Sequence, residues 1–392
     1  MATAPSPLRT ALTGFLILVF SMGIGRFAFT PILPMMQSEG LLSVGDGGVL
    51  ASVHFIGYAM GAVLSWRLTW SPRSVLVLSL AAIALSTIAM GLTNAYGIWL
   101  AARWVAGVCS ALVLVAVSTQ FVKVLAQSGR LELEGVVFAG VGGGTALVGL
   151  MTLWLMAVNA PSRIGWLVFG FATLAVTVAV YVLIANQTFV GPTDSDERTR
   201  SAPRLVWQVI LPYGAMGAGY IIPATYLPIM AQQAIASPMV FGWSWPIFGG
   251  AAAMSTVVAA RLYGTFSNRQ IWIASQLVMG LGLLIPALSS HIVAIIVGGL
   301  CVGGTFMVVT MAGLKEAHNI GGTSGAQHHI AAMTVAFALG QIIGPALAGW
   351  AYDATQSFAY PLLIGGFVLI ATLVPMLKQS VAIAQRPQSP RL

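Results

Sequence analysis

Acidic residues are scarce in this chain, and charge of either sign is uncommon. Nine of the 392 residues are Asp or Glu and 17 are Lys or Arg, so 7% are charged while 58% are hydrophobic. A soluble globular domain has about 25% charged residues, and this composition excludes that class. The net charge of +8 is spread between apolar runs instead of forming a basic patch. We therefore expect a membrane protein with no nucleic-acid partner.

Cysteines and long polar segments are also few. Cys109 and Cys301 are the two cysteines, and neither is part of a CxxC pair, so no disulfide framework, metal centre or cofactor is expected. Outside residues 186–204, which are rich in charge, Pro and Ser, the loops are too short for a soluble catalytic domain. No paired acid and base or activated nucleophile lies at one depth, and no ATPase motif is present. The sequence predicts neither an enzyme nor an ATP-driven pump.

Long apolar runs, in contrast, fill the chain. A bilayer core of about 30 Å is crossed by about 20 helical residues. Twelve runs meet this length: near 11–36, 47–66, 74–93, 96–122, 135–158, 163–186, 205–232, 239–261, 270–289, 291–314, 327–351 and 357–377. With the N-terminus in the cytoplasm, fourteen of the seventeen Lys and Arg residues fall on the cytoplasmic side. This predicts a multi-pass protein of the cytoplasmic (inner) membrane with both termini in the cytoplasm.

The chain contains an internal repeat at a shift of 194 residues. Six identical residues of the first run coincide with residues of the seventh: Met22, Gly23, Gly25, Leu33, Pro34 and Met36 with Met216, Gly217, Gly219, Leu227, Pro228 and Met230. Under the same shift Arg26 corresponds to Tyr220. We predict two pseudo-symmetric halves of six spans, residues 1–185 and 205–392, joined by a cytoplasmic linker at 186–204. Small residues four apart, such as Gly57 and Gly61, are expected to let these helices pack closely.

Several strings in this order resemble those of a known family. RWVAGVCSA at 103–111 looks like the Arg-x-x-x-Gly motif of the major facilitator superfamily. GIGRFAFTPILPMM, GYIIPATYLP, GGTFM and GQIIGPALAGW together resemble its YbfB-type branch. The resemblance implies an all-α fold of twelve transmembrane helices and secondary transport by alternating access of two halves. One departure is the loop at 61–73, which has Ser65 where the superfamily's motif has an acid, so its usual charge relay is not expected.

Two arginines lie inside the apolar runs. Arg26 and Arg103 are each about 7–10 residues from the outer face, or roughly 10–15 Å deep. A charge at the centre of a membrane helix costs roughly 2.5–3.5 kcal/mol on insertion scales, yet all nine acids lie in loops or at span ends. Backbone carbonyls, water or an anionic ligand can offset this cost. We predict a small organic anion bound by Arg26 and Arg103 on one side and by Tyr220 and Gln341 on the other, with Thr30 as a further ligand.

Other interpretations of the polar residues stay open. His54 is a candidate proton carrier for coupled transport, or a hydrogen-bond partner between helices. Efflux of a weakly charged hydrophobic compound is the main alternative function, with Arg26 purely structural. A copper or other metal transporter is a third, because Met307 with Met311 and His329 with Met333 are pairs one helical turn apart. No resident metal is predicted. Besides its small-molecule substrate and the lipid bilayer we expect no partner, and the protein should function as a monomer.

Overall fold

The computed structural model describes residues 6–65, 67–68, 70–185, 206–262 and 265–377, with the side chains of residues 131 and 321–328 outside the description. In this part of the chain every regular element is helical. The N-terminal half contains α1 (Pro7–Leu18), the π-helix η1 (Val19–Ile24), α2 (Phe29–Ser38), α3 (Val44–Leu64), α4 (Pro72–Leu92), α5 (Tyr96–Gln127), the short η2 (Leu131–Leu133), α6 (Glu134–Ala157) and α7 (Ser162–Leu183). The C-terminal half contains α8 (Trp207–Ala234), α9 (Pro238–Phe241), α10 (Ser244–Leu262), α11 (Asn268–Leu288), α12 (Ile292–Thr355) and α13 (Ala359–Ala371).

These helices supply the twelve predicted spans. Ten helical segments are long and apolar enough to cross a membrane; α1, η1 and α2 together form the first, and α12 carries two, at Ile292–Ile320 and His329–Thr355. The seventh and eighth spans are α8 and α10. Three prolines in α8, and Pro246, Arg261 and the Ser and Gly residues of α10, lower the mean hydropathy of these two helices.

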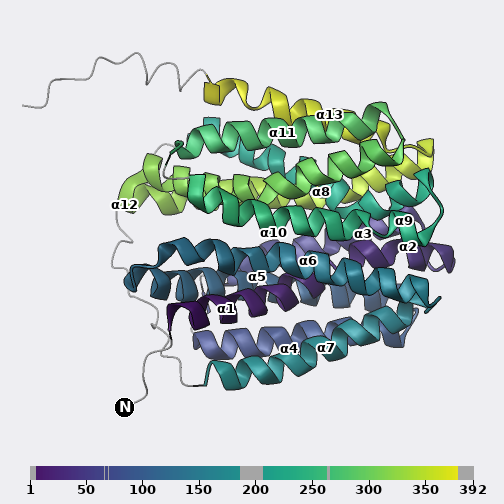
Figure 1. The fold of residues 1–392 in the computed structure, drawn as a ribbon, viewed down its shortest axis with the longest axis horizontal. Helices are drawn as coiled ribbons and strands as arrows, with labels where there is room; N and C mark the ends of the chain where they lie inside the picture. The colour runs from purple at the N-terminus through teal and green to yellow at the C-terminus, as the bar shows by residue number, and fades with distance from the viewer. Residues whose placement is uncertain (1–5, 66, 69, 186–205, 263–264, 378–392) are drawn as a thin grey trace, which may run out of the picture.

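The two halves lie side by side, the N-terminal half below and the C-terminal half above in Figure 1. They meet through α3 against α12, α6 against α10, and α2 against α8. The start of α1 and the end of α13 lie at the same end of the molecule, on the left in Figure 1. The predicted linker at 186–204 falls outside the described residues.

Side-chain caps fix where several helices begin. Ser43 and Asp46 form a reciprocal capping box at the start of α3, and Ser267 and Gln270 form another at the start of α11. The carboxylate of Glu39, at the end of α2, accepts hydrogen bonds from the backbone N–H and the hydroxyl of Ser162 at 2.6 and 2.5 Å. Placing a negative charge at the start of α7 satisfies free backbone donors there and ties the first span to the sixth.

The first span is the most enclosed of the ten candidate spans. In its most apolar window of 18 residues 89% are buried, against 28–61% for the other nine candidate spans. Small residues make this enclosure possible, as predicted. A Cβ added to Gly61 of α3 would lie 2.9 Å from the Cα of Val108 on α5, and one added to Gly23 would lie 2.6 Å from the backbone of Gly144 on α6. Only glycine permits these helices to approach so closely.

Candidate functional site

The first span is broken where it reaches the middle of the molecule. After α1 the backbone widens into the π-helix η1, with Gly25 N–H donating to Phe20 and Phe27 N–H donating to Met22, each five residues back. A turn then separates η1 from α2. Such a break leaves backbone carbonyls without their usual partners, and a membrane interior has no water to satisfy them.

Two side chains of α5 satisfy the freed carbonyls. Arg103 donates from Nη1 to the carbonyl of Gly25 and from Nη2 to that of Arg26, both at 3.3 Å, while Ser110 donates to Ser21 at 3.1 Å. The guanidinium of Arg103 also lies 5.0 Å from the ring centroid of Phe29. Arg103 is thus buried against the backbone of the first span and turned away from any ligand. Its predicted role in substrate binding stays a prediction, and the contacts described here give both of its terminal nitrogens a partner among the carbonyls that the break exposes.

Arg26 sits within the break and points toward the other half of the molecule. Its guanidinium carbon lies 5.1 Å from the ring centroid of Phe27, 5.2 Å from that of Phe55 and 4.8 Å from that of Tyr58. One terminal nitrogen donates a hydrogen bond to the hydroxyl of Tyr220. Among the described residues no carboxylate lies within ion-pair distance of Arg26. A buried cation is therefore held by rings and a phenol, with no counter-charge from the described chain.

Tyr220 on α8 is the residue that the internal repeat aligns with Arg26. The two side chains are in direct contact, whereas the sequence predicts them on opposite sides of the ligand. The phenol oxygen of Tyr220 accepts from Arg26 and from the amide of Gln341 in the second part of α12. Its ring is stacked between Phe306 and Phe337, with centroids 5.2 and 5.7 Å away and planes within 7°. Gln341 is fully buried. It holds the phenol in place and does not border the cavity described below, and its role as a direct ligand stays a prediction.

Thr30 makes a second contact between the halves. Its hydroxyl donates to the carbonyl of Ala224 at 2.7 Å. That carbonyl would normally accept from residue 228 one turn on, but Pro228 has no N–H, so Thr30 fills the vacant place. Thr30 therefore binds backbone and does not border the cavity. Its predicted contact with substrate stays a prediction.

These two contacts locate a pseudo-two-fold axis. Arg26 with Tyr220, and Thr30 with Ala224, are each exactly one repeat apart, 194 residues. A residue that touches its own symmetry counterpart must lie at the axis that relates the two copies. The axis therefore runs between the first and seventh spans, through the hydrogen bond of Arg26.

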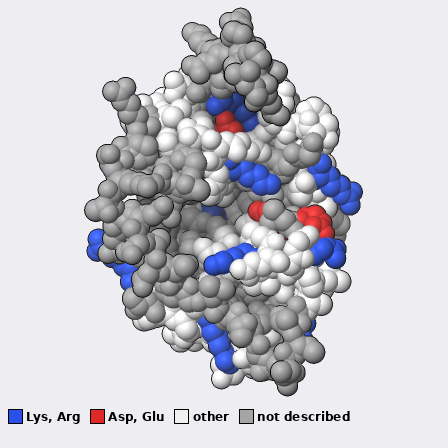
Figure 2. Space-filling model, turned by 90° about the vertical axis from the view of Figure 1, so that its left-hand side faces the viewer, with Lys and Arg blue, Asp and Glu red and all other residues white. Residues whose placement is uncertain are grey.

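A cavity of about 330 Å³ lies between the halves and reaches Arg26 and Tyr220. Its lining combines aromatic, methionine and a few polar side chains: Met22, Arg26, Phe27, Tyr58, Leu114, Ser118, Val122, Glu134, Phe138, Val141, Tyr220, Phe306, Met307, Thr310, Met311, Leu314, Lys315, His318 and Phe337. From mid-depth it extends to Glu134, Lys315 and His318, at the end where α6 begins. Figure 2 views the molecule from that end, with Lys and Arg more prominent than acidic side chains around a central hollow.

The opposite end is closed by contact between α3 and α12. The carboxylate of Asp353 accepts from the N–H of Gly45 at 2.9 Å and from the hydroxyl of Ser43 at 3.3 Å. A Cβ added to Gly48 would lie 2.6 Å from the carbonyl of Pro345. A separate hollow of about 430 Å³ at this end includes neither Arg26 nor Tyr220. The central cavity thus opens toward one side of the membrane only.

At the open end one acid and one base come from different halves. Glu134 at the start of α6 and Lys315 in α12 both line the cavity and interact electrostatically across it. These two charges offset each other. Arg26 lies deeper in the cavity, and its positive charge is not offset by a carboxylate of the described residues.

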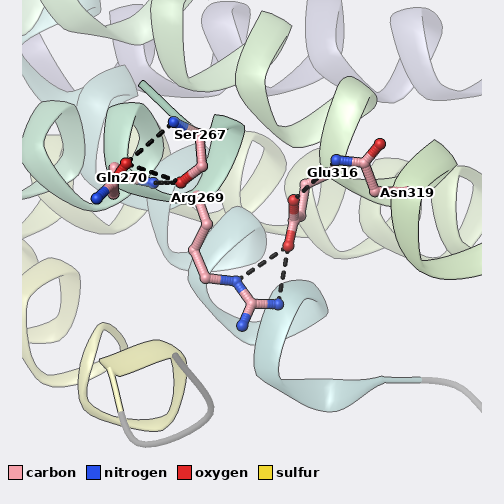
Figure 3. A network of polar contacts seen from close by, with 5 residues as sticks. All are labelled: Ser267, Arg269, Gln270, Glu316 and Asn319. Carbon is pink, nitrogen blue, oxygen red and sulfur yellow. Dashed lines mark hydrogen bonds and ion pairs between the residues drawn. The ribbon is translucent and has the colours of Figure 1, made fainter. Parts of the chain in front are cut away.

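A buried ion pair braces the C-terminal half near the same end. Arg269 at the start of α11 donates to Glu316 of α12 through Nε at 3.0 Å and Nη2 at 2.8 Å, and Glu316 also accepts from Asn319 (Figure 3). No charge relay is expected at the loop 61–73, because it lacks the acid of the superfamily's motif. The ion pair of Arg269 and Glu316 is formed instead at the ends of the ninth and tenth spans. Two N–H donors of Arg269 converge on one oxygen of the carboxylate, Oε1, while Asn319 donates to the other, so both oxygens of buried Glu316 have a partner.

His54 lies behind the cavity wall. It is fully buried on α3, its ring meets Phe55 edge-on at 5.4 Å, and neither ring nitrogen has a well-formed hydrogen bond to a described residue. Its predicted role as a proton carrier stays a prediction. Of the residues considered for a metal, Met307 and Met311 line the cavity, whereas His329 accepts a hydrogen bond from the N–H of Val206. Among the described residues no three His, Cys, Asp or Glu side chains form a metal-binding group.

Sequence reasoning missed the aromatic lining. Phe27 comes from the break of the first span, Tyr58 from α3, and Phe306 and Phe337 from the two passes of α12, and they share no spacing that would mark them as one site. The one available signal was the position of Phe27 directly after Arg26.

Comparison with known proteins identifies the family. The model of a family described as "Uncharacterised MFS-type transporter YbfB" matches residues 18–377. A curated relative, the uncharacterized MFS-type transporter YceJ of Bacillus subtilis (strain 168), is 22% identical over 408 residues, covering 96% of this chain and 97% of the relative.

Solved structures show the same fold at low sequence identity. A crystal structure of a mutant of the nucleoside transporter NupG superimposes with a TM-score of 0.72 at 11% identity, covering 95% of this chain and 99% of the other. The D-xylose-proton symporter gives a TM-score of 0.74 at 14% identity, covering 95% and 97%. The fold is that of the major facilitator superfamily, and the chain belongs to the superfamily's YbfB-type family of transporters.

Proposed function

We propose that this protein is a secondary transporter that carries a small organic anion across the cytoplasmic membrane. One observation carries the proposal: Arg26 borders the central cavity and has no carboxylate partner among the described residues. A low-dielectric cavity with one unmatched cation attracts an anion and repels a cation. An anion also replaces its lost water with hydrogen bonds from the guanidinium.

The two halves support transport by alternating access. The cavity is open where Glu134 and Lys315 stand and closed where Asp353 meets Gly45. Rocking of the halves about the axis at Arg26 and Tyr220 would open the opposite end while the site stays in place. We place the open end and both termini in the cytoplasm because most Lys and Arg residues fall on that side. One chain contains both walls of the site, so a monomer is sufficient for function.

Efflux of a weakly charged hydrophobic compound is the second candidate. Aromatic and methionine side chains make up much of the cavity lining, and they favour contact with the apolar surface of a compound whatever charge it carries. In that case Arg26 would serve the structure alone. Copper transport is less supported, because His329 is hydrogen-bonded to the backbone and does not border the cavity.

A ligand panel on purified protein separates these functions. Organic anions should raise the melting temperature more than cations of matched size, and binding at 100 times Kd adds about 2.7 kcal/mol. Arg26→Ala should abolish the anion effect and the flux of the same anion into proteoliposomes. Arg163→Ala, an exposed arginine at the start of α7, is the matched control and should change neither. Stabilisation by cations alone would refute the proposal, and stabilisation by neutral compounds alone would favour efflux.

A further inference from the structure

The cavity has features that narrow the substrate beyond its charge. Resting on the proposed anion transport, we infer that the ligand is an aryl monocarboxylate, a single carboxylate attached to a flat aromatic ring. The inference combines the number of uncompensated charges, the hydrogen-bond donors available at Arg26, and the aromatic wall of the C-terminal half.

The charge balance of the cavity selects a single negative charge. Arg26 and Lys315 are the Lys and Arg side chains that line it, with Glu134 interacting with Lys315 and His318 also at the mouth. Arg103 is occupied by the carbonyls of Gly25 and Arg26 and adds no donor to the cavity. A dicarboxylate would bring a second charge into an apolar site with no cation to meet it, at a large desolvation cost.

The donors at the deep end suit a carboxylate. A guanidinium has five N–H donors in one plane, and Arg26 spends one of its terminal nitrogens on Tyr220. Tyr220 accepts from Arg26 and Gln341 with both lone pairs of its oxygen, which leaves its own O–H to donate. Rings of Phe27, Phe55 and Tyr58 border the rest of the guanidinium. Arg26 also hydrogen-bonds to the side chain of Tyr58. Its remaining N–H donors and the O–H of Tyr220 lie at the deep end of the cavity, and a carboxylate has the two-oxygen fork that matches a guanidinium.

The C-terminal half faces these donors with a ladder of rings. Trp245, Phe248, Phe306, Tyr220 and Phe337 follow one another with centroids 4.8, 5.7, 5.2 and 5.7 Å apart and planes within 19°. Six aromatic side chains in all line the cavity: Phe27, Tyr58, Phe138, Tyr220, Phe306 and Phe337. A flat ring bound by its carboxylate at Arg26 meets ring faces and edges in the offset or edge-on arrangements that aromatic pairs prefer.

The volume of the cavity limits the ligand to a small one. At about 330 Å³ it lies at the lower end of the range of about 300–1,000 Å³ for ligand pockets. Met22, Met307 and Met311 are flexible enough to adapt to substituents on the ring. A single substituted ring is the body that these dimensions favour.

A matched set of small molecules tests the inference on the purified full-length protein. Binding is measured by calorimetry for benzoate, cyclohexanecarboxylate, phthalate, benzamide and benzylamine, which vary ring character, charge number and charge sign one at a time. We expect benzoate to bind about 2- to 10-fold more tightly than cyclohexanecarboxylate, the factor that ring–ring contact adds beyond buried area. Phthalate, benzamide and benzylamine should bind more weakly than benzoate.

Variants of the ring ladder assign the preference to named residues. Phe337→Leu, at a half-buried position, should bring the benzoate to cyclohexanecarboxylate ratio close to one while anion binding persists. Phe306→Leu should act the same way. Phe367→Leu removes an exposed ring of α13 and should leave the ratio unchanged.

The outcomes separate this inference from the proposal on which it rests. If cyclohexanecarboxylate binds as tightly as benzoate, or phthalate binds more tightly, the aryl monocarboxylate is excluded while an organic anion remains. If the ratio survives both ladder variants, the wall does not recognise the ring and the inference fails in the same way. If only benzamide or benzylamine binds, the anion proposal fails as well.

Discussion

The first and seventh spans are copies of one sequence, and they fold differently. Both contain a Met-Gly pair, a second glycine and a Leu-Pro pair at matching positions. The first span breaks into α1, η1 and α2, whereas α8 remains one helix of 28 residues despite its three internal prolines. The difference therefore does not come from glycine and proline within the spans alone.

The neighbouring spans account for it. In the N-terminal half, α5 presents Arg103 and Ser110 to the carbonyls that the break exposes. The corresponding positions are Val297 and Gly304 at a shift of 194 residues, or Gly299 and Phe306 at the shift of 196 that pairs Gly107 with Gly303, and none of these has a side-chain donor. A broken helix without such donors would leave carbonyls unsatisfied in the membrane, at several kcal/mol each. The lesson is that a helix breaks where a neighbour supplies donors, and the break then positions Arg26.

The largest effect should come from exchanging the two residues at the axis. In the double variant Arg26→Tyr with Tyr220→Arg, the same side chains are present in opposite halves. We expect flux at the background level, at least about 100-fold below that of the unmodified protein. The reason is that α8 has no break and no equivalent of Arg103 to orient the guanidinium. Arg26→Lys is the reference and should retain part of the flux, since Lys keeps the charge without the planar fork. Normal flux in the exchanged protein would show that the contact between the arginine and the tyrosine is sufficient for transport, whichever half carries the arginine.

The second effect contrasts the ion pairs of the two halves. Arg269→Gln removes the partner of buried Glu316 and should destabilise the protein by about 3–5 kcal/mol. Arg130→Gln removes the exposed partner of Glu132 in the N-terminal half, where the hydrogen bond from Arg130 lowers the pKa of the Glu132 carboxyl. This second variant should leave the melting temperature unchanged, because solvent screens an exposed pair. Equal shifts in thermal unfolding would contradict the assignment of Arg269 and Glu316 as a buried brace.

The third prediction uses the same substitution at counterpart positions. Arg103→Met leaves the carbonyls of Gly25 and Arg26 without their donor and should cost about 2–4 kcal/mol of stability. It should also weaken anion binding, because Arg26 loses its fixed backbone. Val297→Met, in the C-terminal half, should do neither. Full stability combined with lost anion binding in Arg103→Met would instead identify Arg103 as a direct ligand.

The smallest effect is expected at His54. His54→Gln keeps a polar group of similar length and should change anion binding at pH 7 by less than about twofold, since His54 does not line the cavity. If His54 carries the coupled proton, flux should lose its dependence on pH between 5 and 8. An unchanged pH profile, measured in proteoliposomes, would assign His54 to packing against Phe55.

The sequence predicted the fold well because its signals are strong and repeated. Twelve apolar runs, the shift that pairs Arg26 with Tyr220, and motifs such as that at 103–111 led to the superfamily, and the family match confirms a transporter and not an enzyme. The directions of side chains were harder to foresee. Nothing in the apolar run around Arg103 indicates that its donors turn to a neighbouring backbone, because the break at Gly25 depends on α5.

One signal for Thr30 was present and went unused. Pro228 leaves the carbonyl of Ala224 without a donor, and the repeat places Thr30 at the matching position in the first span. The ring ladder had no such signal. Phe306 and Phe337 are 31 residues apart on two passes of α12, and only the packing of the halves brings them to Tyr220.

The position of Arg26 on the axis limits how such a site could have arisen. In a dimer of two identical six-span subunits, any residue at the two-fold axis meets its own copy. Such a dimer could place two arginines there, repelling each other in an apolar interior, or none. A single cation at the centre requires that the two halves differ, which joining them in one chain allows. The hydrogen bond between Arg26 and Tyr220 therefore requires two halves of different sequence, and a perfectly symmetric assembly would lack the proposed anion site.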